Sequence, residues 1–381
     1  MQHTEEIIAV LSHLISFQTV SDQPNLNLID FITDYCKPAV EVVRLPHATQ
    51  PKTSLLLRFG PDAPDGIVLS GHTDVVPADP ANWNSNPFEL HQRNQRLYGR
   101  GTADMKTFIA TAMVLGCHTG ALRRPVFLAL TYDEEVGCLA APPLIHTAAS
   151  ALEHIHAVIV GEPTELTPVI ANKGITEYSI VFTGKSAHSS KPHLGINAIS
   201  MATEFIRRIE TLADEFAAAP EPGSSCDPPW TTTQAGTIQG GTATNIVPET
   251  CRVSCDLRSF HTADREYFEK ALEQERTRII ESRNLPQSSI TIHKNCDVPP
   301  LEPIQHSPAL QLAAEITGIQ TPDWVPYATE AGQYQSAGYS TVILGPGSIE
   351  QAHQNNEWIS LAQLEAGSTV LERLFLRQKL Y

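Results

Sequence analysis

Residues 126–137 read VFLALTYDEEVG, an apolar run that ends in consecutive acidic side chains. The run Val126–Thr131 predicts a buried strand, because apolar residues occupy both of its faces. Glu134 and Glu135 follow just past its end. Neighbouring residues on a regular strand point to opposite sides. The pair is therefore predicted to lie on an irregular turn, where each carboxylate has a task of its own.

Other ligand-type residues follow predicted strands in the same way. The strand Gly66–Ser70 runs into SGHTDVVP, which carries His72 and Asp74, and the strand Ala157–Gly161 is followed by Glu162. Helices are predicted between the strands, and a further strand at Ser54–Phe59; the helices cover residues 4–17, Asn27–Cys36 and Met105–Gly116. Alternating strands and helices predict an α/β fold with a doubly wound, mostly parallel sheet. In that fold, ligands bind at the carboxyl ends of the strands.

The pattern changes in the middle of the chain. Strands and helices are predicted there in the order βαββαβ, a two-layer unit; they cover Glu177–Gly184, Asn197–Glu215, Thr232–Gly240, Thr250–Arg258, Ala263–Ser282 and Ser289–His293. The chain later returns to supply His353. We therefore predict a catalytic domain from residues 1–174 and 298–381, with residues 175–297 inserted as a second domain.

Histidines and carboxylates of five separate motifs form a set that can hold two divalent cations. The motifs are SGHTDVVP (70–77), YGRGTADMK (98–106), TYDEEVG (131–137), VGEPT (160–164) and QAHQNNE (351–357). A protein avoids gathering so many carboxylates unless cations neutralise them. Three ligating carboxylates and one hydroxide balance two Zn²⁺, and two ions this close need a bridging carboxylate. Asp104 is the expected bridge, since its loop is rich in small residues; capping of the following helix is its alternative role.

Length and composition limit the classes of function. The chain has 381 residues, 41% hydrophobic and 18% charged, which indicates two globular domains. Its net charge of −16 disfavours nucleic acid or an anionic membrane as a partner. Seven cysteines without a CxxC pair favour a reducing compartment. The start, MQHTEEIIAV, has acidic residues where a secretion signal has basic ones, so we expect a cytoplasmic protein.

These motifs resemble, over essentially the whole chain, the family of zinc aminoacylases, glutamate carboxypeptidases, succinyl-diaminopimelate desuccinylases and acetylornithine deacetylases. The resemblance implies two Zn²⁺, for which Co²⁺ can substitute. It also implies a cis peptide bond after Asp104. The implied metal ligands are His72, Asp104, Glu135, Glu162 and His353.

The resemblance also implies roles beside the metal ligands. Glu134 acts as general base and then general acid, and Asp74 fixes the imidazole of His72. Single motifs have simpler alternatives: a structural His–Asp pair for His72 and Asp74, a solvated acidic loop for Glu134 and Glu135, and a surface loop for His353.

The inserted domain is implied to be a dimerisation or lid domain of a homodimer. His188, in TGKSAHSS, would reach the partner's active site and stabilise an oxyanion. Asn245 in GGTATNIVPE and Arg258 in DLRSFH match substrate-binding positions, and a guanidinium suits a carboxylate. A turn histidine, a turn asparagine and a solvated arginine are the alternatives.

Within the family, GTADMK, GEPT, TEA (329–331) and LGPGSIEQAHQNNEW (344–358) are most similar to the acetylornithine deacetylase branch. This implies removal of acetyl from N2-acetyl-L-ornithine, a step of arginine biosynthesis, by a zinc-bound water that Glu134 activates. The alternatives are succinyl-diaminopimelate desuccinylation, broad N-acyl amino acid deacylation, or a non-catalytic metal-binding scaffold. Glu330 is a candidate to face the substrate's distal ammonium, and Lys173 receives no role.

Overall fold

The structure is a computed structural model that describes residues 3–304 and 306–380. The chain divides into two compact units. The first comprises Met1–Ile170, Pro303–Asp323 and Thr329–Tyr381, and the second comprises Ala171–Glu302 and Trp324–Ala328. The second unit is thus inserted between parts of the first. Residues 171–174, 298–302 and 324–328 fall in the second unit, although the sequence analysis placed them in the first domain.

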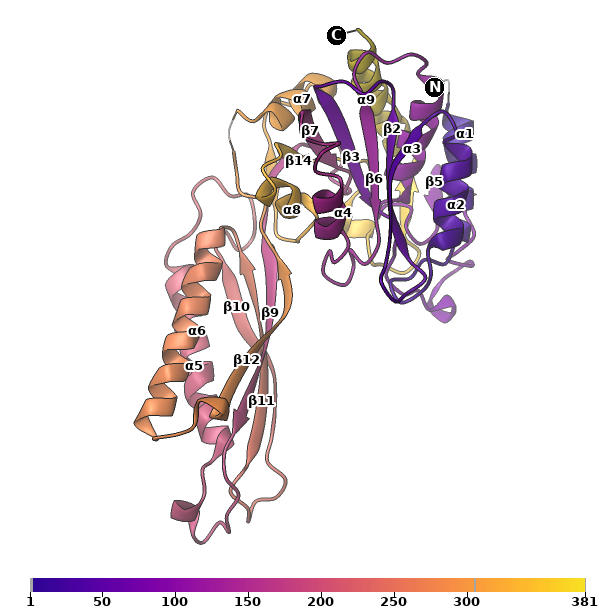
Figure 1. The fold of residues 1–381 in the computed structure, drawn as a ribbon. Coiled ribbons are helices and arrows are strands. Elements are labelled where there is room, and N and C mark those ends of the chain that lie inside the picture. The colour runs from indigo at the N-terminus through magenta and orange to yellow at the C-terminus, as the bar shows by residue number, and fades with distance from the viewer. Residues whose placement is uncertain (1–2, 305, 381) are drawn as a thin grey trace. The chain divides into compact units, whose positions relative to one another are not determined.

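A mixed sheet forms the centre of the first unit (Figure 1). Its strands follow the order β1 (Val40–Pro46), β2 (Thr53–Phe59), β6 (Val126–Thr131), β3 (Gly66–His72), β7 (Ile155–Val160), β14 (Thr341–Ile343), β8 (Val169–Asn172) and β13 (Asp323–Val325). The central strands β6, β3, β7 and β14 pair in parallel, and β1, β2 and β6 pair antiparallel. The predicted mostly parallel sheet is confirmed at its centre.

Helices cover both faces of this sheet, which explains the apolar runs of its strands. Every residue of β3 and β6 is buried. Leu128 and Leu130 belong to a core cluster shared with α1 (Thr4–Ser16), α2 (Leu26–Tyr35), α3 (Lys106–His118), α7 (Pro308–Thr317) and α9 (Leu361–Leu380). Phe127 and Ala129 are buried but lie outside that cluster, on the face where α4 (Ala141–Thr147) and α8 (Ala331–Ser336) contact the sheet. Each leucine buried in this way contributes about 1.5–3 kcal/mol.

A small antiparallel sheet brings two ligand-bearing segments together. Its strands follow the order β15 (Trp358–Ser360), β5 (Arg96–Tyr98) and β4 (His91–Arg93). Trp358 pairs with Tyr98, so the segment after His353 lies beside the start of the loop that carries Asp104. Strands of three residues carry too short a pattern to be seen in the sequence, and they were not predicted.

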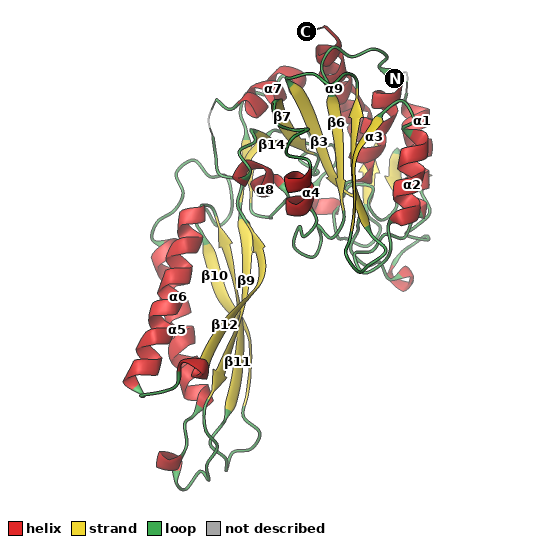
Figure 2. Ribbon diagram, in the orientation of Figure 1, coloured by secondary structure: helices red, strands yellow, loops and turns green. Residues whose placement is uncertain are grey.

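The second unit has the predicted βαββαβ order (Figure 2). Its antiparallel sheet follows the order β10 (Thr232–Gly240), β11 (Thr250–Ser259), β9 (Gly174–Thr183) and β12 (Ile290–Val298). Helices α5 (Ala198–Ala217) and α6 (Thr262–Ser282) pack against the sheet and share one hydrophobic core with it.

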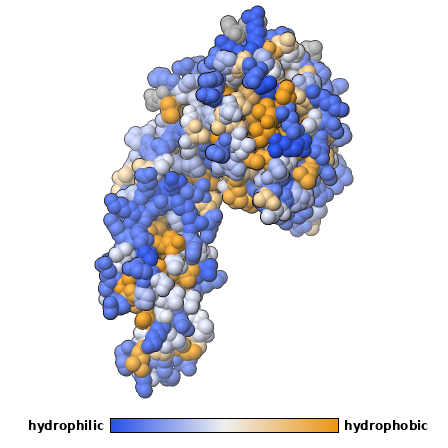
Figure 3. Space-filling view, viewed as in Figure 1, coloured by the Kyte–Doolittle hydropathy of each residue, from blue (hydrophilic) through white to orange (hydrophobic). Residues whose placement is uncertain are grey.

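The surface shown in Figure 3 is largely hydrophilic, with hydrophobic residues scattered over both units. Among the described residues, no helix combines the length and the apolar character needed to cross a bilayer.

Candidate metal centre

The first group of candidate ligands consists of His72, Asp104 and Glu162. His72 ends β3, and Glu162 follows β7, so both side chains lie at the carboxyl edge of the parallel strands. Nε2 of His72 lies 3.0 Å from Oδ1 of Asp104 and 3.8 Å from Oε1 of Glu162. One donor atom from each residue lies within 4.8 Å of the others, and all three residues are buried. This spacing suits a single cation.

The second group consists of Asp104, Glu135 and His353. Nε2 of His353 lies 3.0 Å from Oδ2 of Asp104 and 2.9 Å from Oε2 of Glu135. The side chain of His353 is 54% exposed, so this ligand lies on the solvent side of the group, and its φ is +59°. The structure thus brings together all five residues that the sequence analysis named as ligands.

Asp104 joins the two groups, as expected of a bridge. Its Oδ1 faces His72 and its Oδ2 faces His353. Its position depends on the loop before it, where Gly101 has φ +89°, a conformation that favours glycine. The Asp104–Met105 peptide bond is cis, as the resemblance implies.

Capping of the following helix by Asp104 was the alternative, and it is wrong. The residue before α3 is Met105, and no side chain caps that helix among the described residues.

The electrostatics of the cluster show why it needs cations. Burial raises the pKa of Glu162 to about 8, and the neighbouring Asp104 adds to the rise. Burial and Asp104 also raise the pKa of Glu135. Hydrogen bonds to Asp104 and Glu135 raise the pKa of His353 to about 10. The carboxyl groups of Glu162 and Glu135 therefore tend to stay protonated, and His353 tends to keep its proton. A divalent cation bound to these side chains would favour their deprotonated forms.

An unpaired oxygen atom of Glu135 also indicates that the cluster binds cations. Oε1 of Glu135 is buried and has no hydrogen-bond partner among the described residues. An unpaired buried carboxylate oxygen is costly, and coordination to a cation would satisfy it. Carboxylate and imidazole ligands in groups of three leave room for water or substrate, as catalytic zinc sites do. The residues present therefore fit two cations.

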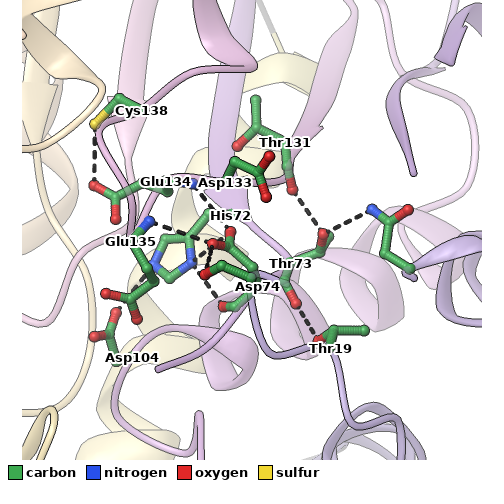
Figure 4. A network of polar contacts seen from close by, with 12 residues as sticks. Thr19, His72, Thr73, Asp74, Asp104, Thr131, Asp133, Glu134, Glu135 and Cys138 are labelled. Atoms are coloured by element: carbon green, nitrogen blue, oxygen red, sulfur yellow. Dashed lines mark hydrogen bonds and ion pairs between the residues drawn. The ribbon is translucent and has the colours of Figure 1, made fainter. Parts of the chain in front are cut away.

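Glu134 lies beside this cluster but belongs to neither ligand group (Figure 4). The thiol of Cys138 donates a hydrogen bond to its Oε1 across 3.3 Å. Burial raises the pKa of Glu134 well above its usual range, and the charges of Glu162 and Glu135 add to the rise. Asp133 and Cys138, on either side of the pair, have positive φ, so the predicted irregular turn is confirmed. A carboxylate with a raised pKa is suited to accept and return a proton near neutral pH.

Asp74 holds the turn of Glu134 and Glu135 more than it holds His72. Its carboxylate accepts hydrogen bonds from the backbone N–H groups of Glu134 and Glu135, at 3.2 and 3.3 Å. Nδ1 of His72 instead lies 2.9 Å from the carbonyl oxygen of Asp74 and 3.6 Å from its carboxylate, too far for a hydrogen bond. The hydrogen-bond partner of the His72 imidazole is therefore the main-chain carbonyl of Asp74, and not its carboxylate as expected.

Behind Asp74 lies a network that the sequence analysis missed. Ser21 donates a hydrogen bond to the Asp74 carboxylate at 2.7 Å. Lys52 forms a buried ion pair with Asp133 at 2.6 Å and also donates to the carbonyl oxygen of Ser21. These contacts fix the residue that precedes Glu134. Neither Ser21 nor Lys52 stands in a recognisable motif, so only long-range folding could reveal their role.

A third histidine–carboxylate group lies elsewhere on the first unit. His3, Glu6 and His118 place donor atoms within 4.8 Å of one another. Tyr35 and His118 already bond Oε1 of Glu6, at 2.7 and 3.0 Å, and lower the pKa of that carboxyl. A surface ion-pair cluster explains these contacts, and we assign no metal to them.

The other predicted site residues lie in the second unit, whereas the ligand groups lie in the first. Exposed His188 and Asn245 come from adjoining segments: Ser189 donates to the carbonyl oxygen of Asn245, and Nδ1 of His188 lies 2.8 Å from the Ser190 hydroxyl. Arg258 is ion-paired with Asp256 at 3.1 Å.

The two residues without a firm role prove to be buried. Lys173 donates to the carbonyl oxygens of Pro228 and Trp230, which indicates a structural role. Glu330 is fully buried and accepts hydrogen bonds from Thr131 and Ser70. These contacts indicate a structural role for Glu330.

Comparison with known proteins places this geometry in context. The model of peptidase family M20/M25/M40 matches residues 68–377. A curated acetylornithine deacetylase of Myxococcus xanthus is 32% identical over 371 residues, covering 96% of this chain and 95% of the relative. The structure of an aminopeptidase from Bacillus cereus aligns with a TM-score of 0.75 at 18% identity, over 98% of both chains. That of a dinuclear metal-binding M20 peptidase from Bacillus subtilis aligns with a TM-score of 0.65 at 17% identity, over 99% of both chains.

Proposed function

Because this chain belongs to peptidase family M20/M25/M40, we propose that it is a zinc-dependent amide hydrolase that removes the acetyl group from N2-acetyl-L-ornithine. The class of enzyme, a hydrolase, follows from the family. The substrate is inferred from the curated relative of the same name, which matches nearly end to end. The observation that carries the proposal is the pair of ligand groups that share Asp104, with Glu134 beside them and outside both.

We propose that the first group would hold one Zn²⁺ and the second group another. When bound, the ions would polarise the acetyl carbonyl and lower the pKa of water. Glu134 accepts a proton from the attacking water and returns it to the departing amine. Asp74 keeps the backbone of Glu134 and Glu135 in place during both transfers, through hydrogen bonds to their N–H groups.

His188 of the partner subunit is proposed to donate a hydrogen bond to the developing oxyanion, and Asn245 and Arg258 to bind the substrate. These roles rest on the resemblance. Arg258 would have to exchange its ion pair with Asp256 for the substrate carboxylate. A guanidinium that is one-third exposed can do so at little cost, because exposed ion pairs contribute little.

A homodimer through the second unit is supported by the edges of its sheet. The β12 edge carries the charged residues Lys294 and Asp297, which discourage pairing. The β10 edge has the sequence TTQAGTIQG, without a charge, and its Ile238 is 51% exposed. We propose that β10 and the neighbouring face of α5 meet their copies in the partner, in a cytoplasmic dimer.

The experiment that tests the substrate assignment is a panel of N-acyl amino acids. A succinyl group brings an additional carboxylate whose burial calls for a further basic side chain. Lys173 is engaged by backbone carbonyls. The quoted motifs of the second unit carry Arg258, which is proposed for the substrate carboxylate, and the exposed Lys185. We expect kcat/KM for acetylornithine to exceed that for succinyl-diaminopimelate by about tenfold or more, or about 1.4 kcal/mol. Equal values, or faster hydrolysis of the succinyl compound, would overturn the substrate while leaving the hydrolase class intact.

A further inference from the structure

Glu357 has an unusual position for a charged residue. Its side chain is fully buried, with 0% exposure. It comes four residues after His353 and immediately before β15. The metal groups do not contain it, and the proposed chemistry does not use it.

The carboxylate of Glu357 accepts hydrogen bonds from four donors, all from the loop that leads to Asp104. Its Oε1 accepts from the backbone N–H groups of Ala103 at 2.7 Å and Asp104 at 3.0 Å. Its Oε2 accepts from the N–H of Gly101 at 2.9 Å and from the guanidinium of Arg100 at 2.8 Å. The backbone of Glu357 adds a fifth contact, since its carbonyl oxygen accepts from the N–H of Gly99 at 3.1 Å.

These contacts explain the shape of the loop. Backbone N–H groups that converge on one anion form a nest, and a buried nest without its anion would leave several donors unpaired. Gly101 permits the required turn, and a side chain there would meet the stem of Lys106 at 3.0 Å. Burial raises the pKa of Glu357, and the guanidinium of Arg100, 2.8 Å from its carboxylate, opposes that rise.

We propose, on the basis of the proposed two-cation function, that Glu357 is a positioning residue that fixes the distance between Asp104 and His353. One end of the link is the direct hydrogen bond to the Asp104 backbone. The other end is the short stretch of chain from Glu357 back to His353. His353 itself has an exposed side chain and a positive φ. The first ligand group depends on this link only through Asp104, because His72 and Glu162 are held by β3 and β7. The second group depends on it through both Asp104 and His353.

The proposal is tested by titrating the cation-free protein with Zn²⁺ in competition with a chromophoric chelator. Wild type is compared with Glu357→Gln, Glu357→Asp and His353→Ala, and His353→Ala identifies the step that belongs to the second group. Glutamine places an amide donor against other donors, whereas aspartate keeps the charge but is too short to reach all four. In both Glu357 variants we expect the Zn²⁺ affinity of the second ligand group to weaken about tenfold or more. The affinity of the first group should change by about threefold at most.

Glu302→Gln is the matched control, because Glu302 also accepts a backbone N–H, from Thr262 at 2.9 Å, but lies in the second unit. Its two binding steps should equal those of wild type. Circular dichroism of the cation-free variants shows whether they fold, and Glu357→Asp carries the test if the glutamine variant does not.

Two outcomes overturn the positioning role: unchanged affinity at both steps, or equal weakening of both. Wild-type protein that binds fewer than two Zn²⁺ would instead contradict the proposed function. The two failures are therefore distinguishable.

Discussion

At the scale of single residues, the centre is defined by which oxygen faces which partner. Asp104 turns one oxygen to His72 and the other to His353. One oxygen of Glu135 has no hydrogen-bond partner in the part of the chain that the structure describes. Glu134, which immediately precedes Glu135, instead accepts a hydrogen bond from the thiol of Cys138. Adjacent glutamates thus receive different tasks because the irregular turn aims them differently.

The raised pKa values predict that cation affinity falls as the pH falls. Without a cation, His353, with a pKa of about 10, is protonated below pH 10, and Glu162, with a pKa of about 8, is protonated below pH 8. Both must lose their protons to coordinate, so binding releases protons. Chelator competition between pH 6 and 8 should show affinity rising by about tenfold per pH unit for each proton displaced. Affinity independent of pH over this range would mean that these side chains do not bind the cation.

At the scale of elements, the strand ends place the ligands, and this was predictable. The strand Val126–Thr131 was predicted with the bounds that β6 has, because an apolar run followed by acidic residues gives a sharp signal. Helix α4 was missed, because Pro142 and Pro143 indicate a loop, although proline also suits the first turn of a helix. Helix α9 was not assigned. The contacts of Glu357 and Lys52 join segments far apart in sequence, and no local pattern shows them.

Close packing of strand ends predicts a sensitive position at Gly345, which follows β14. A Cβ there would lie 2.1 Å from the carbonyl oxygen of Gly161 and 2.5 Å from that of Glu162. Gly345→Ala must therefore displace the backbone that carries Glu162. We expect the free energy of unfolding to fall by about 1–3 kcal/mol, measured by urea unfolding of the cation-free protein, together with weaker binding at the first ligand group.

Gly236→Ala is the control for this change, because the nearest atom to a Cβ at that position, the carbonyl oxygen of Ser254, is 3.9 Å away. If Gly345→Ala behaves like Gly236→Ala in both measurements, the strand ends are not packed as described.

At the scale of the whole molecule, the chain divides its tasks between two units. The first holds both ligand groups, and the second holds His188, Asn245 and Arg258. The alternation of strands and helices was enough to predict both folds. Sequence patterns say nothing of how subunits meet, so the dimer remains a prediction that rests on the resemblance and on the uncharged β10 edge.

Mixing two inactive variants tests whether His188 acts across the dimer. In a hybrid of Glu134→Gln and His188→Ala subunits, one of the two sites has both native residues if His188 comes from the partner. Random exchange makes half of the dimers hybrids, so we expect about one quarter of wild-type activity. No recovery after exchange has been verified with tagged subunits would show that His188 acts within its own subunit or not at all.

The most direct test of the central claim is the variant Glu134→Gln, examined for cation content and for turnover of acetylornithine together. Glutamine keeps the size of the side chain but cannot accept a proton. The account predicts two Zn²⁺ per chain, as in wild type, and a kcat lower by about 10²-fold or more. Loss of cations in proportion to activity would make Glu134 a ligand, and retention of wild-type kcat would show that another group moves the proton; either result contradicts the account.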